Sequence, residues 1–153
     1  MSIQVTNILG NSPATLLVAL LVDQLGIYTR VADQGDWPAF LEHMPDKPDE
    51  CLCVYDTMGI KDGRMMNTME TVMHHGIEIL LRSRDYTAPY TKARSISADL
   101  SALTPQNFSL LGSTYRVYNI TETTAPTHLG EEAGTIRRYY VSVNMLFSVR
   151  RVV

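Results

Sequence analysis

The clearest pattern in the chain is a regular alternation of apolar and polar residues near its C-terminal end. The alternation runs from Ile136 to Val149 and has Leu146 as its exception. Its apolar positions are Tyr139, Val141, Val143, Met145, Phe147 and Val149, and its polar positions are Arg138, Tyr140, Ser142, Asn144, Ser148 and Arg150. Because successive residues of a strand point to opposite faces, this segment predicts a long strand with one buried face and one wetter face.

A nearly continuous apolar run from Ala14 to Leu25 predicts the first helix. Ser12 is a good N-cap, and Pro13 suits the first helical position because its missing N–H has no partner there anyway. Gly26 can end the helix in a left-handed conformation. A helix that is apolar nearly all round is typical of one that is deeply buried or also covered by a neighbouring subunit.

The segment between this helix and residue 84 predicts three strands. Ile27–Val31 is a short strand, and Cys51–Tyr55 is apolar on both faces, which places it centrally in a sheet. Thr71–Arg84 alternates, and Gly76 within it indicates a bulge. Asp56–Gly63 is polar and rich in glycine and aspartate, so we expect it to be a connection.

A second helix is predicted from Ala88 to Leu103. Thr87 is the expected cap, Pro89 sits in the first turn and Pro105 stops the helix. Its apolar residues recur at spacings of three and four, as on the buried side of an amphipathic helix. A strand from Thr114 to Thr121 follows.

These elements predict a single domain covering residues 1–153. There is no internal repeat, low-complexity tract or long linker. We expect the α+β class, with two helices packed on one face of a mixed, mostly antiparallel β-sheet of about four to six strands.

The composition narrows the function classes. Hydrophobic residues make up 45% and charged residues 19% of the chain, and the net charge is −3. Such a mildly acidic chain is not expected to read nucleic acid by electrostatics. The apolar run of the first helix is too short to span a bilayer and lacks the flanks of a signal sequence, so we expect no membrane partner.

Motifs for catalysis, cofactors or metals are missing from the sequence. It holds no Gly-rich phosphate loop, dinucleotide fingerprint or nucleophile elbow. Cys51 and Cys53 lack a second pair of ligands nearby, so we interpret them as buried, reduced strand thiols and expect no metal site. We therefore predict no cofactor and no enzymatic activity.

One alternative keeps a catalytic role open. A small enzyme would use Asp56 with His74 or His75, since carboxylates that follow strands often act as acids or bases. Against it, the adjacent histidines point to opposite faces of a strand, and turn chemistry accounts for Asp56 and Asp62.

Arginines cluster around two of the predicted strands. Arg82 and Arg84 share one face of a strand, and Arg137 and Arg138 stand at the start of the final strand. A basic stripe can track phosphates. With a negative net charge, we favour protection of sheet edges and salt bridges within or between subunits. The predicted subunit or partner contacts are Arg82, Arg84, Arg137, Arg138, Tyr140 and Asn144.

Three stretches, taken in order, resemble siphophage tail terminator (tail completion) proteins, a family of the phage minor capsid type. The first is the apolar strand Cys51–Tyr55 followed by Asp56 and Gly59. The second is Ile79–Tyr86, a strand with arginines and a tyrosine, before an amphipathic helix. The third is Leu129–Gly130 with Gly134, Arg137, Tyr139 and Asn144 at the start of the final strand.

The resemblance implies a virion structural protein of the tail that is assembled in the host cytoplasm. It implies a homohexameric ring that ends tail-tube polymerisation and joins the tail to the head neck, with the tail tube protein and a head-neck connector as partners. DNA would pass through the lumen without specific binding. A long final strand can extend sheets between subunits. Another head-tail connector or tail subunit is the alternative within the same class.

Overall fold

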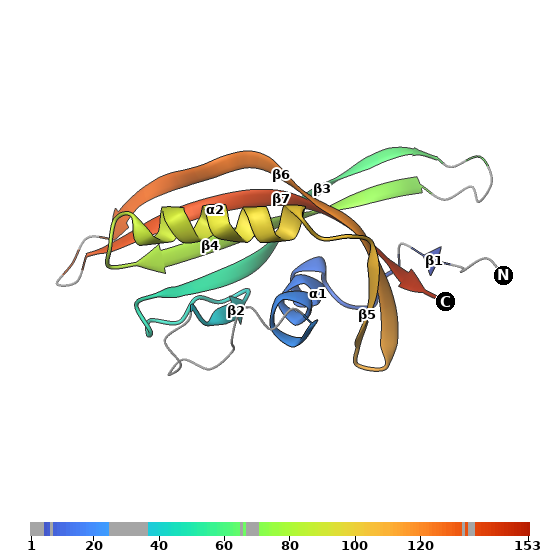
Figure 1. The fold of residues 1–153 in the computed structure, drawn as a ribbon, viewed down its shortest axis with the longest axis horizontal. Helices are drawn as coiled ribbons and strands as arrows, with labels where there is room; N and C mark the ends of the chain where they lie inside the picture. Colours follow the sequence, from blue (N-terminus) through green and yellow to red (C-terminus); the bar gives the residue numbers. More distant parts are fainter. Residues whose placement is uncertain are drawn as a thin grey trace.

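The computed structural model describes residues 5–6, 8–24, 37–64, 66, 71–132, 134 and 137–153. The predicted strand Ile27–Val31 and the expected cap Gly26 lie outside these residues. The elements are, in chain order, β1 (Val5–Thr6), α1 (Pro13–Ala19), the π-helical turn η1 (Leu20–Gln24), β2 (Ala39–Leu41), β3 (Cys51–Arg64), β4 (Thr71–Ser83), α2 (Ala88–Ser101), β5 (Gln106–Leu110), β6 (Ser113–Glu132) and β7 (Arg138–Val152) (Figure 1).

The strands form one sheet in the order β2-β3-β4-β7-β6-β5, and the short β1 pairs with the end of β7. Only the pair β2–β3 is parallel among the described strands, and the other pairs are antiparallel. The predicted α+β class with a mixed, mostly antiparallel sheet is therefore confirmed. Seven strands are described, one more than the upper bound of the expectation, and β1, β2 and β5 lie where no strand was predicted.

The final strand lies in the middle of the sheet. It is hydrogen-bonded to β4 on one edge and to β6 on the other, and β1 pairs with its end at Arg151 and Val152. Most of its backbone is thus paired within the subunit, and contact of this strand with a neighbour stays a prediction. The alternation itself is confirmed, since Val141, Val143 and Phe147 are fully buried.

The start of the first helix follows the sequence signals. Ser12 Oγ accepts a hydrogen bond from the Thr15 backbone nitrogen at 3.2 Å, and Pro13 is the first residue of α1. The residues of α1 from Leu16 to Ala19 and the two leucines that open η1 are all buried. The first helix, which is apolar on almost every side, is therefore covered by its own subunit.

The segment Asp56–Gly63, predicted as a connection, is instead the outer half of strand β3. It pairs with β4, with Thr57 opposite Gly76 and Ile60 opposite His74. The register shift between those two pairs places an extra residue on β3, so the expected bulge lies beside Gly76 but in the partner strand. Polar residues form a strand here because the ladder to β4 satisfies the backbone while the side chains remain solvated.

The second helix is also in the predicted place but is capped differently. It runs from Ala88 to Ser101, and its Ala93, Ile96 and Leu100 are fully buried. The side chain of Thr87 makes no capping bond. Asp85 accepts a hydrogen bond from the Thr87 backbone nitrogen at 3.2 Å and orders the approach to the helix.

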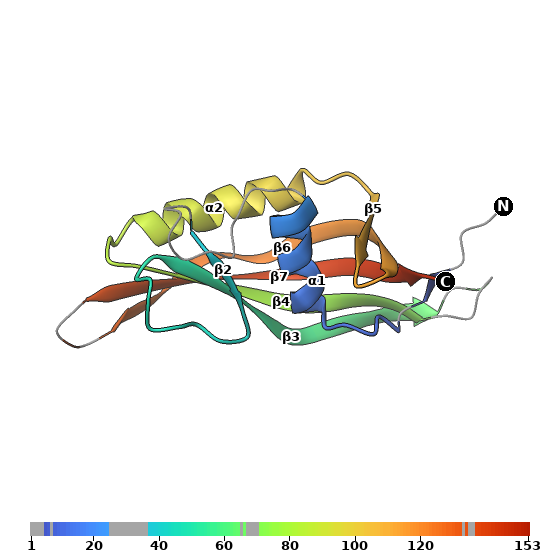
Figure 2. The same cartoon turned by 90° about the horizontal axis from the view of Figure 1, so that it is seen from below.

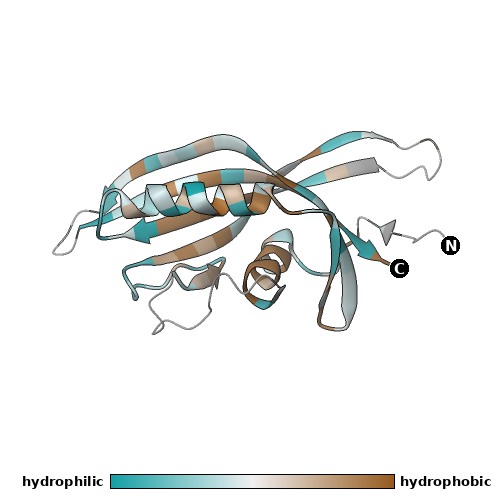
Figure 3. Cartoon of the chain, in the orientation of Figure 1, coloured by the Kyte–Doolittle hydropathy of each residue, from teal (hydrophilic) through white to brown (hydrophobic). Residues whose placement is uncertain are grey.

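Both helices contribute to a single hydrophobic core with inward residues of the long strands. Figure 2 shows α1 and α2 on the same side of the sheet, with α2 running along it and α1 crossing it. Figure 3 shows α1 as the most hydrophobic helix and alternating bands along the strands. The opposite face of the sheet, called the open face below, has no helix over it in the described part of the chain. The hairpin β5–β6 begins at Gln106, where sequence analysis predicted no strand.

Candidate interaction surfaces

Arg82 lies on the open face of β4 and holds the loop that leads into β3. The residue is 3% exposed. Its Nη2 donates to the carbonyl oxygens of Pro45, Asp46 and Pro48 at 2.7, 3.2 and 2.6 Å, and its Nε donates to that of Asp49 at 3.1 Å. These bonds fold the loop over one end of the open face. Arg82 therefore has partners inside the subunit, and its contact with a neighbour stays a prediction.

Arg138 binds the same loop from strand β7. It is 5% exposed, and its Nη1 donates to Asp46 Oδ1 at 3.0 Å. Its Nε lies 2.9 Å from Asp49 Oδ1, and Glu132 Oε2 lies 3.6 Å from Nη1. A buried guanidinium needs such partners because an unpaired charge is costly to bury. Arg138 is thus a second internal clamp on this loop, and its role between subunits stays a prediction.

The other predicted contact residues are open to solvent or partly so. Arg84 is exposed and pairs with Asp49 through Nε at 2.7 Å, and Arg137 is exposed just before β7. Tyr140 is half-buried and donates its hydroxyl to Glu132 Oε2 at 2.8 Å. Asn144 is half-buried on the open face, opposite Glu78 on β4. These four remain available to a partner, and their role in assembly stays a prediction.

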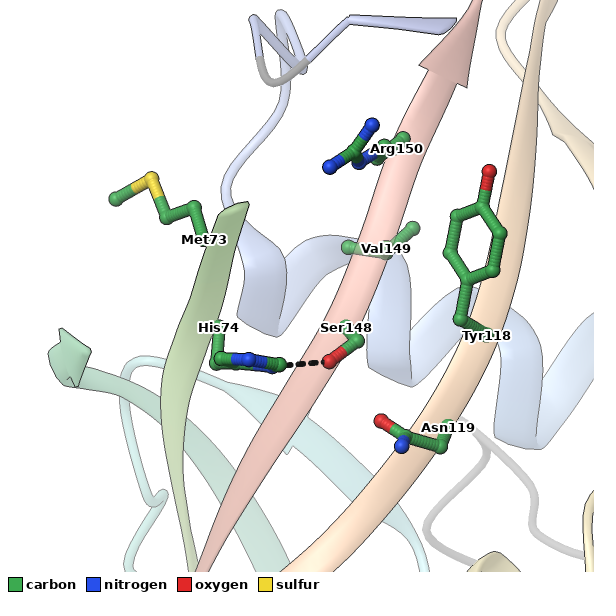
Figure 4. A pocket seen from close by; sticks show the side chains of 7 residues that line it. All are labelled: Met73, His74, Tyr118, Asn119, Ser148, Val149 and Arg150. Carbon is green, nitrogen blue, oxygen red and sulfur yellow. Dashed lines mark hydrogen bonds between the residues drawn. The ribbon is translucent and has the colours of Figure 1, made fainter. Parts of the chain in front are cut away.

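Another polar arrangement lies on the outer halves of β3 and β4, around His74. His74 Nδ1 lies 2.5 Å from Ser148 Oγ (Figure 4). On its other side, His74 Nε2 lies 2.7 Å from Asp62 Oδ2. Because a carboxylate only accepts, Nε2–H donates to Asp62, and in the neutral imidazole Nδ1 then accepts from the Ser148 hydroxyl. His74 therefore links β3, β4 and β7 at this point.

A shallow pocket of about 400 Å³ opens beside His74. Its lining residues are Met73, His74, Tyr118, Asn119, Ser148, Val149 and Arg150 (Figure 4). The order serine, histidine, aspartate resembles a nucleophilic relay. Ser148, however, is 8% exposed in the central strand of the sheet, and Asp62 is largely exposed. This geometry suits a structural link better than attack on a substrate.

The alternative catalytic pair of Asp56 with a histidine is only partly assembled. Asp56 Oδ1 accepts a hydrogen bond from the Ala14 backbone nitrogen at 2.8 Å, at the start of α1. His74 is bound to Asp62 on the open face. His75 is buried on the other face, where burial lowers its pKa and the nearby Asp56 opposes that shift. The structure thus assigns Asp56 to a helix end, and the loop-shaping role expected for it is wrong.

Both cysteines are buried free thiols on β3, as predicted. Burial raises the pKa of the Cys51 thiol to about 11 and also raises that of Cys53. A thiol with a raised pKa stays protonated at neutral pH and is a poor nucleophile and metal ligand. Within the described residues, no group of three or more His, Cys, Asp or Glu side chains could hold a metal ion.

Apolar side chains are exposed on the outer part of the β3–β4 hairpin. We call residues 57–64, 66 and 71–76 the arm. Met58, Ile60 and Met66 of the arm are 93%, 51% and 94% exposed. Three large apolar side chains exposed on one hairpin make the arm a candidate interaction site.

A second surface lies at the other end of the subunit, around the start of α2. The ring of His128 stacks on Tyr86 at a centroid distance of 4.5 Å and on Tyr90 at 5.5 Å, and Tyr86 meets Tyr139 edge-on at 5.4 Å. We call the small hollow that these rings border the aromatic pocket; its volume is about 210 Å³, and it is lined by Tyr86, His128, Gly130, Glu131 and Tyr139.

Neither apolar surface, nor the pair His74–Asp62, is predicted from the sequence. The β3 half of the arm is predicted as a connection and its β4 half as a strand, and neither pattern indicates that the methionines are exposed. The aromatic pocket joins Tyr86, in the loop before α2, with residues of β6 and β7 that no local spacing relates. The one available signal was the density of methionine, since five of the eight methionines lie between residues 58 and 73.

None of the described helices has the length and apolar character needed to cross a membrane. Residues 24–147 match the model of a family described as bacteriophage tail terminator protein. No curated protein matches the chain.

Proposed function

The chain belongs to the bacteriophage tail terminator family, whose members are structural proteins of the virion tail, and on that premise we propose that it forms a hexameric ring. The ring ends polymerisation of the tail tube and joins the tail to the neck of the head. The observation that carries this proposal is the match over residues 24–147, which spans α2 and the strands from β2 through most of β7.

The ring has two partners besides its own copies. One face binds the last ring of the tail tube protein, and the other binds a head-neck connector protein. DNA passes through the lumen without specific contacts, which agrees with a net charge of −3. Assembly takes place in the host cytoplasm, needs no cofactor and involves no catalysis.

Several features of the subunit support assembly over chemistry. Two apolar surfaces stand at opposite ends of an elongated subunit (Figure 1). A ring built by head-to-tail contacts needs two different, complementary surfaces of this kind. Two groups of the catalytic alternative are bound to the protein itself, Asp56 to Ala14 and His74 to Asp62.

The direct test is to let the tail tube protein of the same phage polymerise with and without this chain. We expect short tubes with one ring at an end, visible by negative-stain electron microscopy, and a mass of six subunits for the ring. Tubes of unchanged length with bare ends would contradict the proposal. A ring that binds the neck protein but never the tube would favour the alternative, another head-tail connector.

Charge reversals separate assembly from folding. Arg137→Glu is expected to reduce the yield of capped tubes while the melting temperature stays close to that of the parent chain, since exposed charge changes usually cost under about 0.5 kcal/mol. Lys47→Glu is the matched control, because Lys47 is equally exposed in the loop before β3. Equal capping by both variants would remove Arg137 from the interface.

A further inference from the structure

The arm carries an apolar surface that its own subunit does not cover. Met58 and Met66 are almost fully exposed, and Ile60 is half exposed. Methionine is flexible and polarisable, and its sulfur makes favourable contacts with aromatic rings. A partner surface rich in aromatic edges is therefore the natural complement of the arm.

The aromatic pocket has the required chemistry. Its walls are the rings of Tyr86, His128 and Tyr139, and Tyr86 is 55% exposed. At about 210 Å³ it is smaller than the roughly 300–1,000 Å³ typical of small-molecule sites. A side chain from another protein fits this size better than a metabolite does, and tyrosines are enriched at the energetic centres of interfaces.

Charge also matches between the two surfaces. Lys61 is exposed on the arm next to Ile60, and Glu131 is exposed at the lining of the aromatic pocket. On the arm Asp62 is paired with His74, so Lys61 is the exposed charge beside Ile60 that can meet Glu131, which is of opposite sign. Such complementarity sets the register and orientation of two partners.

The two surfaces lie at opposite ends of the same elongated subunit. In Figure 1 the arm extends beyond α1 to one end, while the start of α2 and the adjoining ends of β6 and β7 form the other. The arm therefore cannot reach the aromatic pocket of its own chain. Contacts between unlike surfaces on successive copies generate rings when the rotation closes.

We propose that the arm of one subunit docks on the aromatic pocket of a second copy of this chain, with Met58 and Met66 against the rings and Lys61 facing Glu131. The inference deepens the proposed function, because it rests on the ring and names the contact that closes it. The occupant of the pocket is a neighbouring subunit, and the same contact repeats around the ring.

A charge-swap cycle tests the proposed register. Lys61→Glu and Glu131→Lys should each reduce ring yield at a fixed concentration about tenfold, and the double variant should restore it. Sedimentation velocity on the full chain measures the yield. Leu111→Ser serves as a control, since Leu111 is 84% exposed in the turn between β5 and β6, outside both surfaces. A double variant that assembles no better than the singles would overturn the pairing of Lys61 with Glu131.

Mixing two defective chains tests the head-to-tail geometry. The variant Met58→Ser/Met66→Ser has a defective arm, and Tyr86→Ser has a defective pocket. Each alone should be monomeric, whereas the mixture should form one-to-one heterodimers and no rings, because only one of the two contacts is intact. Melting curves check that both variants are folded. Full rings from either variant alone would overturn the proposal.

The outcomes also separate this inference from the proposed function. If the wild-type chain neither forms rings nor caps tubes, the proposed function itself fails. If the arm variant forms normal rings that no longer cap tubes, the arm binds the tail tube protein and the subunit contact is wrong. If wild-type rings form only on tube ends, the number of capped tube ends replaces ring yield as the measurement. Rescue of capping in the double variant Lys61→Glu/Glu131→Lys then remains the deciding result.

Discussion

The carboxylate of Asp56 accepts a hydrogen bond from the backbone nitrogen of Ala14 across 2.8 Å, so a residue of strand β3 completes the N-terminus of helix α1. The first turn of α1 contains no acidic residue, and the first N–H groups of a helix have no partner within it. Asp56 thus supplies both an acceptor and a negative charge at the positive end of the helix dipole. The contact ties the first helix to the sheet.

Removal of this acceptor is expected to destabilise the subunit. Asp56→Ala should lower the free energy of unfolding by about 1 kcal/mol, within the range measured for lost helix caps. Asp56→Asn is the matched control, because its amide oxygen can still accept the bond and only the charge is lost. Urea unfolding followed by circular dichroism measures both. An alanine variant as stable as the parent chain would contradict the capping role.

Gly59 is predicted to be essential because of close packing between strands. A Cβ at Gly59 would lie 2.4 Å from the carbonyl oxygen of His74, which is backbone and cannot move without breaking the ladder. Gly59→Ala should therefore cost about 1–3 kcal/mol of stability. Gly63→Ala on the same strand is the control, since nothing lies within 4 Å of its Cβ. Similar melting temperatures for the two variants would show that the arm adapts freely.

The stability of the subunit should fall in mild acid because of His75. Burial lowers the pKa of His75 below its ordinary value of 6.5, so the unfolded chain binds more protons than the folded one near and below that pH. The stability that depends on a neutral His75 is fully present above about pH 6.5. It is lost as the pH falls from there through the pKa of His75 in the folded state.

The pH effect can be assigned with a substitution. His75→Gln should show a flatter dependence of the unfolding free energy between pH 7.5 and pH 5, since glutamine does not titrate in the range of about 5–8 where histidine does. Guanidinium unfolding at several pH values provides the measurement. Parallel curves for the two chains would mean that other groups cause the acid sensitivity.

Loss of the Arg82 guanidinium should release the loop before β3. Arg82→Ala removes four hydrogen bonds to carbonyl oxygens of residues 45–49, and bonds to a charged group contribute about 1.5–3 kcal/mol each at most. We expect a loss of about 2 kcal/mol or more and faster amide exchange in the loop. Arg84→Ala should change stability by less than about 1 kcal/mol, because its ion pair is exposed. Equal losses of stability in Arg82→Ala and Arg84→Ala would contradict the role of Arg82 in holding this loop.

Local patterns in the sequence determined the elements of this protein. Ser12 and Pro13 set the start of α1, the alternation after residue 138 gave β7 its buried face, and the stripe of Ala93, Ile96 and Leu100 gave α2 its buried side. These features follow from neighbours within a few residues, which is the range that periodicity and capping signals report. The resemblance to tail terminator proteins, confirmed by the family match, also rests on the order of such local stretches.

The tertiary structure decided which residues meet. Asp56 and Ala14 are 42 positions apart, and the carbonyls that hold Arg82 come from a loop more than 30 residues earlier. The spacing of the arginines along a strand determines only which face of the sheet they lie on. Whether that face is exposed or buried depends on the loop that folds over it, so the sequence fits either an exposed stripe or a buried clamp. The arm likewise forms a strand pair because β4 provides hydrogen-bond partners for the backbone of the polar segment in β3. The composition of that segment alone predicts a turn.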